Sequence, residues 1–156
     1  MSFIYYTQSK LVFGVGSQNQ LEALLRENAA TSILLIYSGD YVFDLGIHDV
    51  INQAARNIGA NLIENGDVVP NPHIDLVRNL IDQARAADVD FILAVGGASS
   101  FDTAKAVGVG LEYDGDVWDL FTGVAEPQSS VSVGVISAIP GERFRGIGLR
   151  GASTRT

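Results

Sequence analysis

The sequence predicts an α/β domain in which a parallel sheet is covered by helices on both faces. The first observation is that short apolar runs alternate along the chain with amphipathic segments of helical period, which is typical of successive βαβ units. The second is the length, because 156 residues suffice for one such domain. The third is the composition: 47% hydrophobic and 18% charged residues indicate a globular chain rather than a disordered one.

Four apolar runs are the predicted strands. Residues 33–37 and 91–95 consist almost entirely of aliphatic and aromatic side chains, as expected for strands buried on both faces of a parallel sheet. Residues 61–63 form a shorter and weaker run, and residues 131–139 form the last one. Because these runs are separated by predicted helices, their carboxyl ends are expected to meet at one edge of the sheet.

The predicted helices lie between these runs. Residues 47–58 carry apolar side chains at the spacing of a single helix face. Ser17 and Gln20 form a capping box, which predicts a helix from about residue 21. Residues 99–108 are the last predicted helix.

Asn71 and Pro72 predict the start of a further helix, in which Asn71 is the N-cap and Pro72 occupies the first turn. Its inner face is expected to carry Ile74, Val77, Ile81 and Ala84.

Charge and cysteine content exclude several functional classes. Ten Lys and Arg residues against eighteen Asp and Glu residues give a net charge of −8, which argues against nucleic acid or an anionic membrane as the main partner. The absence of Cys excludes a disulfide scaffold, a cysteine nucleophile and a thiolate metal site. The first residues lack the pattern of a secretory signal and no run is long enough to cross a membrane, so we expect a soluble, cytoplasmic protein.

The last sixteen residues differ in composition from the rest. Residues 1–140 carry six Lys and Arg against seventeen Asp and Glu, whereas residues 141–156 carry four Arg against one Glu and show no helical or strand period. We therefore expect a domain over 1–140 and an unrelated or disordered basic tail over 141–156. A flexible basic terminus that belongs to the domain is an equally good explanation.

The strongest motif directly follows the run at 91–95. Gly96, Gly97, Ala98 and Ser99 are small residues between a buried strand and a helix, where a phosphate can approach the backbone and meet the N–H groups of the first helical turn. The alternative interpretation is a tight turn whose small residues serve only packing between the strand and the helix. In that case Ser99 is the helix cap and Asp102 closes a capping box.

Several ordered motifs together favour the first interpretation. The segment GGASSFDTAK at 96–105 accompanies FGVG at 13–16, VVPNP at 68–72 and YDGDVWD at 113–119. These motifs resemble the N-terminal domain of the iron-containing (group III, metal-dependent) alcohol dehydrogenases, in the branch similar to butanol dehydrogenases. The resemblance covers about residues 1–140. Ala98 stands where a third glycine is usual, which narrows the space for a phosphate.

The resemblance implies a Rossmann-like fold and an oxidoreductase that transfers hydride between NAD(P) and a primary alcohol or an aldehyde. It implies that residues 96–99 hold the pyrophosphate and that Asp102 lies near the nicotinamide side. It also implies a cofactor contact for Asn71 near the adenosine, although a helix cap alone explains that residue. The intact enzyme is also a possible homo-oligomer.

The choice between NADP and NAD depends on residues 38–40. Ser38, Gly39 and Asp40 follow the run at 33–37, and Gly39 takes the place where NAD-preferring members of the family carry an aspartate. This slightly favours NADP. A shift of one residue would bring the carboxylate of Asp40 to that place and would favour NAD instead.

The match to the family stops at Gly141, so we expect a truncated chain that is inactive by itself. The family's helical C-terminal domain, whose Asp and His side chains hold Fe²⁺ or Zn²⁺, would be absent. His48 and His73 are expected to be surface residues rather than metal ligands. Two other hypotheses stay open: a non-catalytic, flavodoxin-like module that binds a nucleotide or phosphate, and a truncation product without a role.

Overall fold

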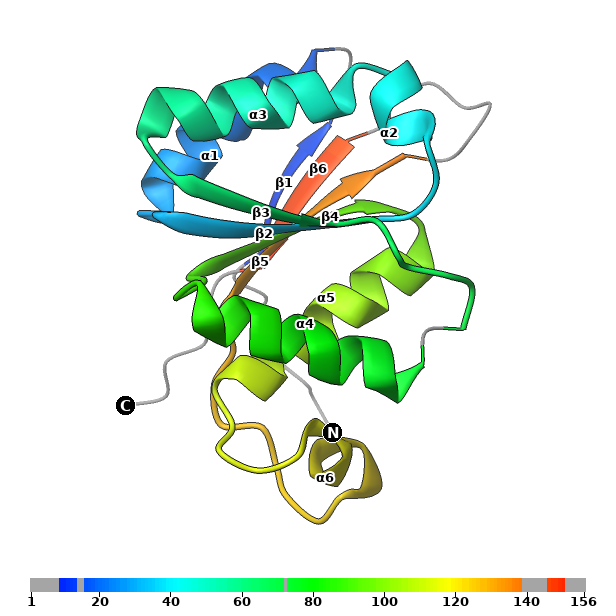
Figure 1. The fold of residues 1–156 in the computed structure, drawn as a ribbon. Coiled ribbons are helices and arrows are strands. Elements are labelled where there is room, and N and C mark those ends of the chain that lie inside the picture. The colour runs from blue at the N-terminus through cyan, green and yellow to red at the C-terminus, as the bar shows by residue number, and fades with distance from the viewer. Residues whose placement is uncertain (1–8, 14–15, 72, 139–145, 151–156) are drawn as a thin grey trace, which may run out of the picture.

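The computed structural model describes residues 9–13, 16–71, 73–138 and 146–150. Its centre is a six-stranded sheet in the order β1-β6-β5-β4-β2-β3 (Figure 1). The strands are β1 (Ser9–Phe13), β2 (Ser32–Tyr37), β3 (Asn61–Asn65), β4 (Phe91–Gly96), β5 (Ser132–Ser137) and β6 (Gly146–Arg150).

Four adjacent strands form the parallel sheet that the sequence predicts. Strand β2 pairs in parallel with both β3 and β4, and β4 pairs in parallel with β5. All six residues of β4 are buried, as its continuous apolar sequence indicates. Strand β3 is at the edge and is only partly buried, which explains its weaker sequence signal.

The other two strands, β1 and β6, run antiparallel to their neighbours. Strand β6 lies in the segment where the sequence predicts no strand. Strand β6 lies between β5 and β1 and pairs antiparallel with both. The expectation of no strand in residues 141–156 was therefore wrong for Gly146–Arg150. In Figure 1 the red strand β6 lies between the orange β5 and the blue β1, although the chain reaches it last.

Helices cover both faces of the sheet, which confirms the predicted fold class. Helices α1 (Leu21–Glu27) and α3 (Ile47–Ile58) lie on one face, and α4 (Ile74–Ala86) and α5 (Ala98–Leu111) lie on the other (Figure 1). The side chains of a strand point alternately to opposite faces, so β2 contributes to the hydrophobic core on each face of the sheet. Ile33 and Leu35 pack with α1 and α3, whereas Leu34 and Ile36 pack with α4 and α5.

Two predicted helix starts and one predicted capping box differ from what is observed. Ser17–Gln20 form a 3₁₀ turn without a side-chain cap, so the capping box is absent, and α1 follows at Leu21. His73, not Asn71, is the N-cap of α4. Helix α5 begins at Ala98, one residue before the predicted start at Ser99, and its N-cap is Gly97 rather than Ser99, the cap in the packing interpretation. In each case the backbone turn determines where the helix begins, which side-chain spacing alone does not reveal.

Two short helices complete the chain. Helix α2 (Tyr41–Asp44) follows β2, and α6 (Val117–Thr122) lies within the long connection from α5 to β5. No helix in the described part of the chain combines the length and the apolar character that crossing a membrane requires.

Candidate functional site

The carboxyl ends of β2, β4 and β5 meet at one edge of the sheet. Tyr37 at the end of β2 is in register with Val95 of β4, and Gly96 of β4 is in register with Ser137 of β5. The loop after β2 therefore lies beside the turn after β4. Open α/β sheets bind their ligands at this kind of edge.

The turn after β4 is crowded at Gly96 and open at Gly97. Gly96 is buried and has φ +141°, a conformation that side chains with a Cβ rarely adopt. Gly97 is extended, and a Cβ on it would meet nothing within 4 Å, so the space in front of it is open. The N–H groups of Ala98 and Ser99 belong to the first turn of α5, where no intrahelical acceptor exists.

Two hydroxyl groups that the sequence analysis missed lie at this turn. A Cβ on Gly96 would lie 2.7 Å from Ser100 Oγ and 2.8 Å from Tyr41 OH. Ser100 Oγ lies 3.4 Å from Ser38 Oγ, which is itself 3.4 Å from Tyr41 OH. Only the pairing of β2 with β4 brings Ser38 and Tyr41 to Ser100, so no local sequence signal could have found this cluster.

The loop after β2 is shaped by Gly39 and carries an exposed carboxylate. Gly39 has φ +74°, and Asp40 is the N-cap of α2, without a hydrogen bond from its side chain to that helix. Ser38 forms an isolated β-bridge with Asp67, which brings the loop after β3 alongside. The structure thus brings Ser38 close to the turn at Gly96, whereas Asp40 is exposed.

The electrostatic environment of this loop is negative. Burial raises the pKa of the Tyr37 phenol, and the charges of Glu64, Asp40 and Asp67 raise that pKa further. The deprotonated phenol would be an anion, so the same charges disfavour any additional negative group placed here.

Two other predicted site residues lie on the exposed surface. Asn71 has φ +56°, a turn conformation that asparagine tolerates better than most residues. Asp102 lies on α5 and faces Lys105 Nζ at 3.5 Å, with half or more of each side chain exposed. Within the described ranges, neither the Asn71 nor the Asp102 side chain forms a hydrogen bond or an ion pair with residues 96–99.

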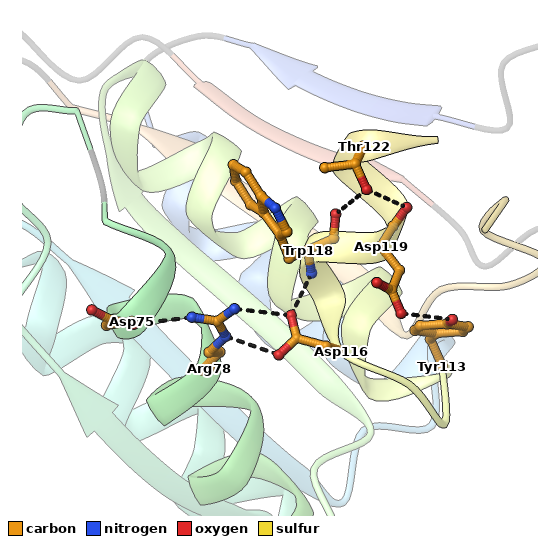
Figure 2. A network of polar contacts seen from close by, with 7 residues as sticks. All are labelled: Asp75, Arg78, Tyr113, Asp116, Trp118, Asp119 and Thr122. Atoms are coloured by element: carbon orange, nitrogen blue, oxygen red, sulfur yellow. Dashed lines mark hydrogen bonds and ion pairs between the residues drawn. The ribbon is translucent and has the colours of Figure 1, made fainter. Parts of the chain in front are cut away.

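A second polar cluster fixes helix α6 against α4 (Figure 2). Arg78 of α4 donates from Nε and Nη2 to the carboxylate of Asp116, at 3.0 and 3.2 Å, and from Nη1 to Asp75 at 3.1 Å. Asp116 also accepts the N–H of Trp118 and so caps α6. A hollow of about 190 Å³ lies beside Arg78 and Asp116. The charges here are paired with one another.

Comparison with known proteins identifies the family. The family model described as iron-containing alcohol dehydrogenase matches residues 8–142. The chain belongs to the iron-containing alcohol dehydrogenases. Over 137 residues it is 36% identical to a probable NADH-dependent butanol dehydrogenase 2 of Bacillus subtilis, with 86% of this chain and 34% of that protein covered. It is 28% identical to the NADPH-dependent aldehyde reductase YqhD of Escherichia coli, with 89% of this chain and 36% of that protein covered.

Solved structures of this family have the same fold. The NADH-dependent butanol dehydrogenase A of Thermotoga maritima superposes with a TM-score of 0.80 at 24% identity, over 96% of this chain and 41% of that one. A crystal structure of Escherichia coli YqhD gives a TM-score of 0.74 at 30% identity, over 87% of this chain and 35% of that one. This iron-containing alcohol dehydrogenase chain therefore spans about a third of the length of the curated relatives it matches.

The described residues do not supply a site for the metal of the iron-containing alcohol dehydrogenases. No group of three or more His, Cys, Asp or Glu side chains within the described ranges could hold a metal ion. His48 is partly buried rather than fully exposed: its Nε2 lies 2.9 Å from Glu64 Oε2, and Asn52 also contacts the ring. One histidine and one carboxylate fall short of the three or four protein ligands that iron or zinc requires.

Proposed function

We propose that this chain is the nucleotide-binding domain of an NAD(P)-dependent alcohol dehydrogenase or aldehyde reductase, whose substrates are primary alcohols or the corresponding aldehydes. The observation that carries the proposal is the turn from Gly96 to Ser99, which opens at the carboxyl edge of the sheet in a member of this family. The open space in front of Gly97 leaves room for a phosphate, and the N–H groups of the first turn of α5 favour its negative charge.

In this proposal the chain's own residues bind and orient the cofactor. The backbone from Gly96 to Ser99 holds the pyrophosphate, and Ser38, Gly39 and Asp40 face the adenosine ribose. Asn71 contacts the adenosine side and Asp102 lies toward the nicotinamide. When bound, the nicotinamide supplies or accepts the hydride. No step through a metal is assigned to these residues, because the described part of the chain holds no ligand set for one.

We propose further that the cofactor is NAD rather than NADP, against the slight preference that Gly39 suggests. The support is the charge at the end of β2. Asp40 is exposed there, and Asp67 is bridged to Ser38. A 2′-phosphate would add negative charge beside these carboxylates, whereas a ribose 2′-hydroxyl can donate to one of them. The two Bacillus subtilis relatives at 36% and 33% identity are both described as NADH-dependent.

Isothermal titration of the chain with NAD⁺, NADP⁺, FMN and inorganic phosphate tests the proposed function. We expect saturable binding of a nicotinamide dinucleotide and none of FMN. Binding of FMN or of phosphate alone, without NAD⁺ or NADP⁺, would contradict the proposal and would favour a non-catalytic phosphate-binding module.

Asp40→Asn tests the cofactor preference. The substitution removes one negative charge and keeps the side-chain shape, so we expect the affinity for NADP⁺ to rise about fivefold, while that for NAD⁺ falls or stays constant. Titration of both cofactors against both proteins measures this ratio. Asp44→Asn, on the last residue of α2, is the matched control. Tighter binding of NADP⁺ than of NAD⁺ by the unaltered chain would reverse the assignment.

A further inference from the structure

Three hydroxyl groups converge on the turn after β4 without satisfying one another. They belong to Ser38 in the loop after β2, Tyr41 at the start of α2 and Ser100 in the first turn of α5. The two oxygen–oxygen distances that connect them are both 3.4 Å. Hydrogen bonds between hydroxyl groups are normally about 2.5–3.0 Å long, so these contacts are weak.

The Ser100 hydroxyl contacts a residue outside its own helix. Its neighbour Thr103 donates to the carbonyl of Ser99 at 2.7 Å, as hydroxyl groups in helices commonly do. Ser100 is completely buried, yet its Oγ is directed to Ser38 instead. A buried hydroxyl with only a long contact has unused hydrogen-bonding capacity.

Tyr41 spans the two loops that form the site. A Cβ on Gly39 would lie 3.2 Å from Tyr41 Cδ1 and Cε1, and a Cβ on Gly96 would lie 2.8 Å from Tyr41 OH. The ring therefore lies over the loop that follows β2, and the hydroxyl reaches the turn that follows β4. Glycine at both positions provides the space for this ring and its hydroxyl.

We propose that the Tyr41 hydroxyl donates a hydrogen bond to the pyrophosphate of the bound dinucleotide, and that Ser38 and Ser100 position this hydroxyl. The assignment rests on the proposed nucleotide-binding function. It names the pyrophosphate because the hydroxyl lies at Gly96, where the phosphate-binding turn begins, whereas the ring lies at Gly39 near the ribose. A phenolic O–H is a good donor to an anionic oxygen, and such charge-assisted bonds are strong.

Tyr41→Phe tests this role, because it keeps the ring that packs over Gly39 and removes only the hydroxyl. We expect the affinity for NAD⁺ and for ADP to fall about tenfold in isothermal titration. The ³¹P resonances of bound NAD⁺ should also shift, a readout that a purely structural role would not change. Tyr113→Phe is the matched control, since it removes a partly buried phenol that contacts Asp119 outside this site. Its affinity should equal that of the unaltered chain.

The outcomes separate this role from the proposed function. If the unaltered chain binds NAD⁺ and Tyr41→Phe binds it within twofold with the same ³¹P shifts, the role of Tyr41 is wrong and the proposed function stands. If the unaltered chain binds neither NAD⁺ nor NADP⁺, both are wrong. If Tyr41→Phe loses thermal stability, Ser100→Ala provides the second test: it leaves the Tyr41 phenol intact and should weaken NAD⁺ binding by a smaller factor.

Discussion

Two polar regions of this molecule use hydrogen-bonding groups in opposite ways. Around Arg78 and Asp116, charged groups pair at 3.0–3.2 Å, and Asp116 also caps α6 (Figure 2). At the turn after β4, hydroxyl groups stand 3.4 Å apart and the backbone at Gly97 faces open space. Paired groups stabilise the fold, whereas groups left with unused capacity at a sheet edge are available to a ligand. The contrast separates a structural cluster from the proposed binding site, although both are rich in polar atoms.

The largest expected effect is on binding, from Gly97→Val. A branched side chain would occupy the open space in front of the turn, and we expect NAD⁺ affinity to fall about a hundredfold or more. Because Gly97 is extended, with φ −105°, the backbone accepts valine, and only the preference for glycine at an N-cap is lost, about 1 kcal/mol of stability. Titration and urea unfolding measure the two effects separately. Unchanged affinity would mean that the turn serves packing alone.

Substitution of the adjacent Gly96 should mainly affect the stability of the fold rather than the binding of NAD⁺. We expect Gly96→Ala to destabilise the fold by about 1–3 kcal/mol, because φ is +141° and the new Cβ would lie within 3 Å of Ser100 Oγ and Tyr41 OH. Urea unfolding at pH 7 measures the change, with Gly97→Ala as the neighbouring control that should lose less stability, because only the N-cap preference for glycine is lost there. Equal stability of the two variants would show that the crowding at Gly96 is relieved by rearrangement of the loop after β2.

The smallest effect is expected in the paired cluster, and it depends on pH. The hydrogen bond from Arg78, followed by that from the Trp118 N–H, holds the pKa of Asp116 below its ordinary value. A carboxylate with a lowered folded-state pKa contributes stability above its unfolded pKa of about 3.9 and loses that contribution as the pH falls through the folded value. Both side chains are about half exposed, so the contribution is small.

Asp116→Asn should therefore lower the urea midpoint at pH 7, and this difference should shrink as the pH falls below the unfolded pKa and through the folded one. Asp114→Asn is the control, because it alters an exposed carboxylate in the same loop. NAD⁺ affinity should be the same in both variants. A loss of NAD⁺ binding in Asp116→Asn would show that the cluster around Arg78 is not purely structural.

Local sequence patterns were sufficient for the framework of the domain. The buried runs at 33–37 and 91–95 correspond to β2 and β4, and the apolar face at 47–58 corresponds to α3. The glycine-rich turn was found because a strand, small residues and a helix follow one another directly. The order of these motifs also indicated the family that the comparisons confirm.

Helix starts were less predictable, because they depend on backbone conformation rather than on side-chain type. Asn71 is typical of a cap in sequence, yet it lies two residues before the N-cap of α4, with φ +56°. Gly97 caps α5 although Ser99 carries the side chain that capping usually favours.

What the sequence determined by itself is the alternation of strands and helices, both core faces and the position of the glycine-rich turn after β4, since each depends on residues a few positions apart. Only the tertiary structure decided that β6 lies between β1 and β5, and that Tyr41 and Ser38 meet Ser100 at Gly96. These contacts join segments dozens of residues apart, and their geometry depends on strand register and helix packing. The periodicity of hydrophobic residues within one segment does not specify this register. The register is selected because it buries both faces of the whole sheet.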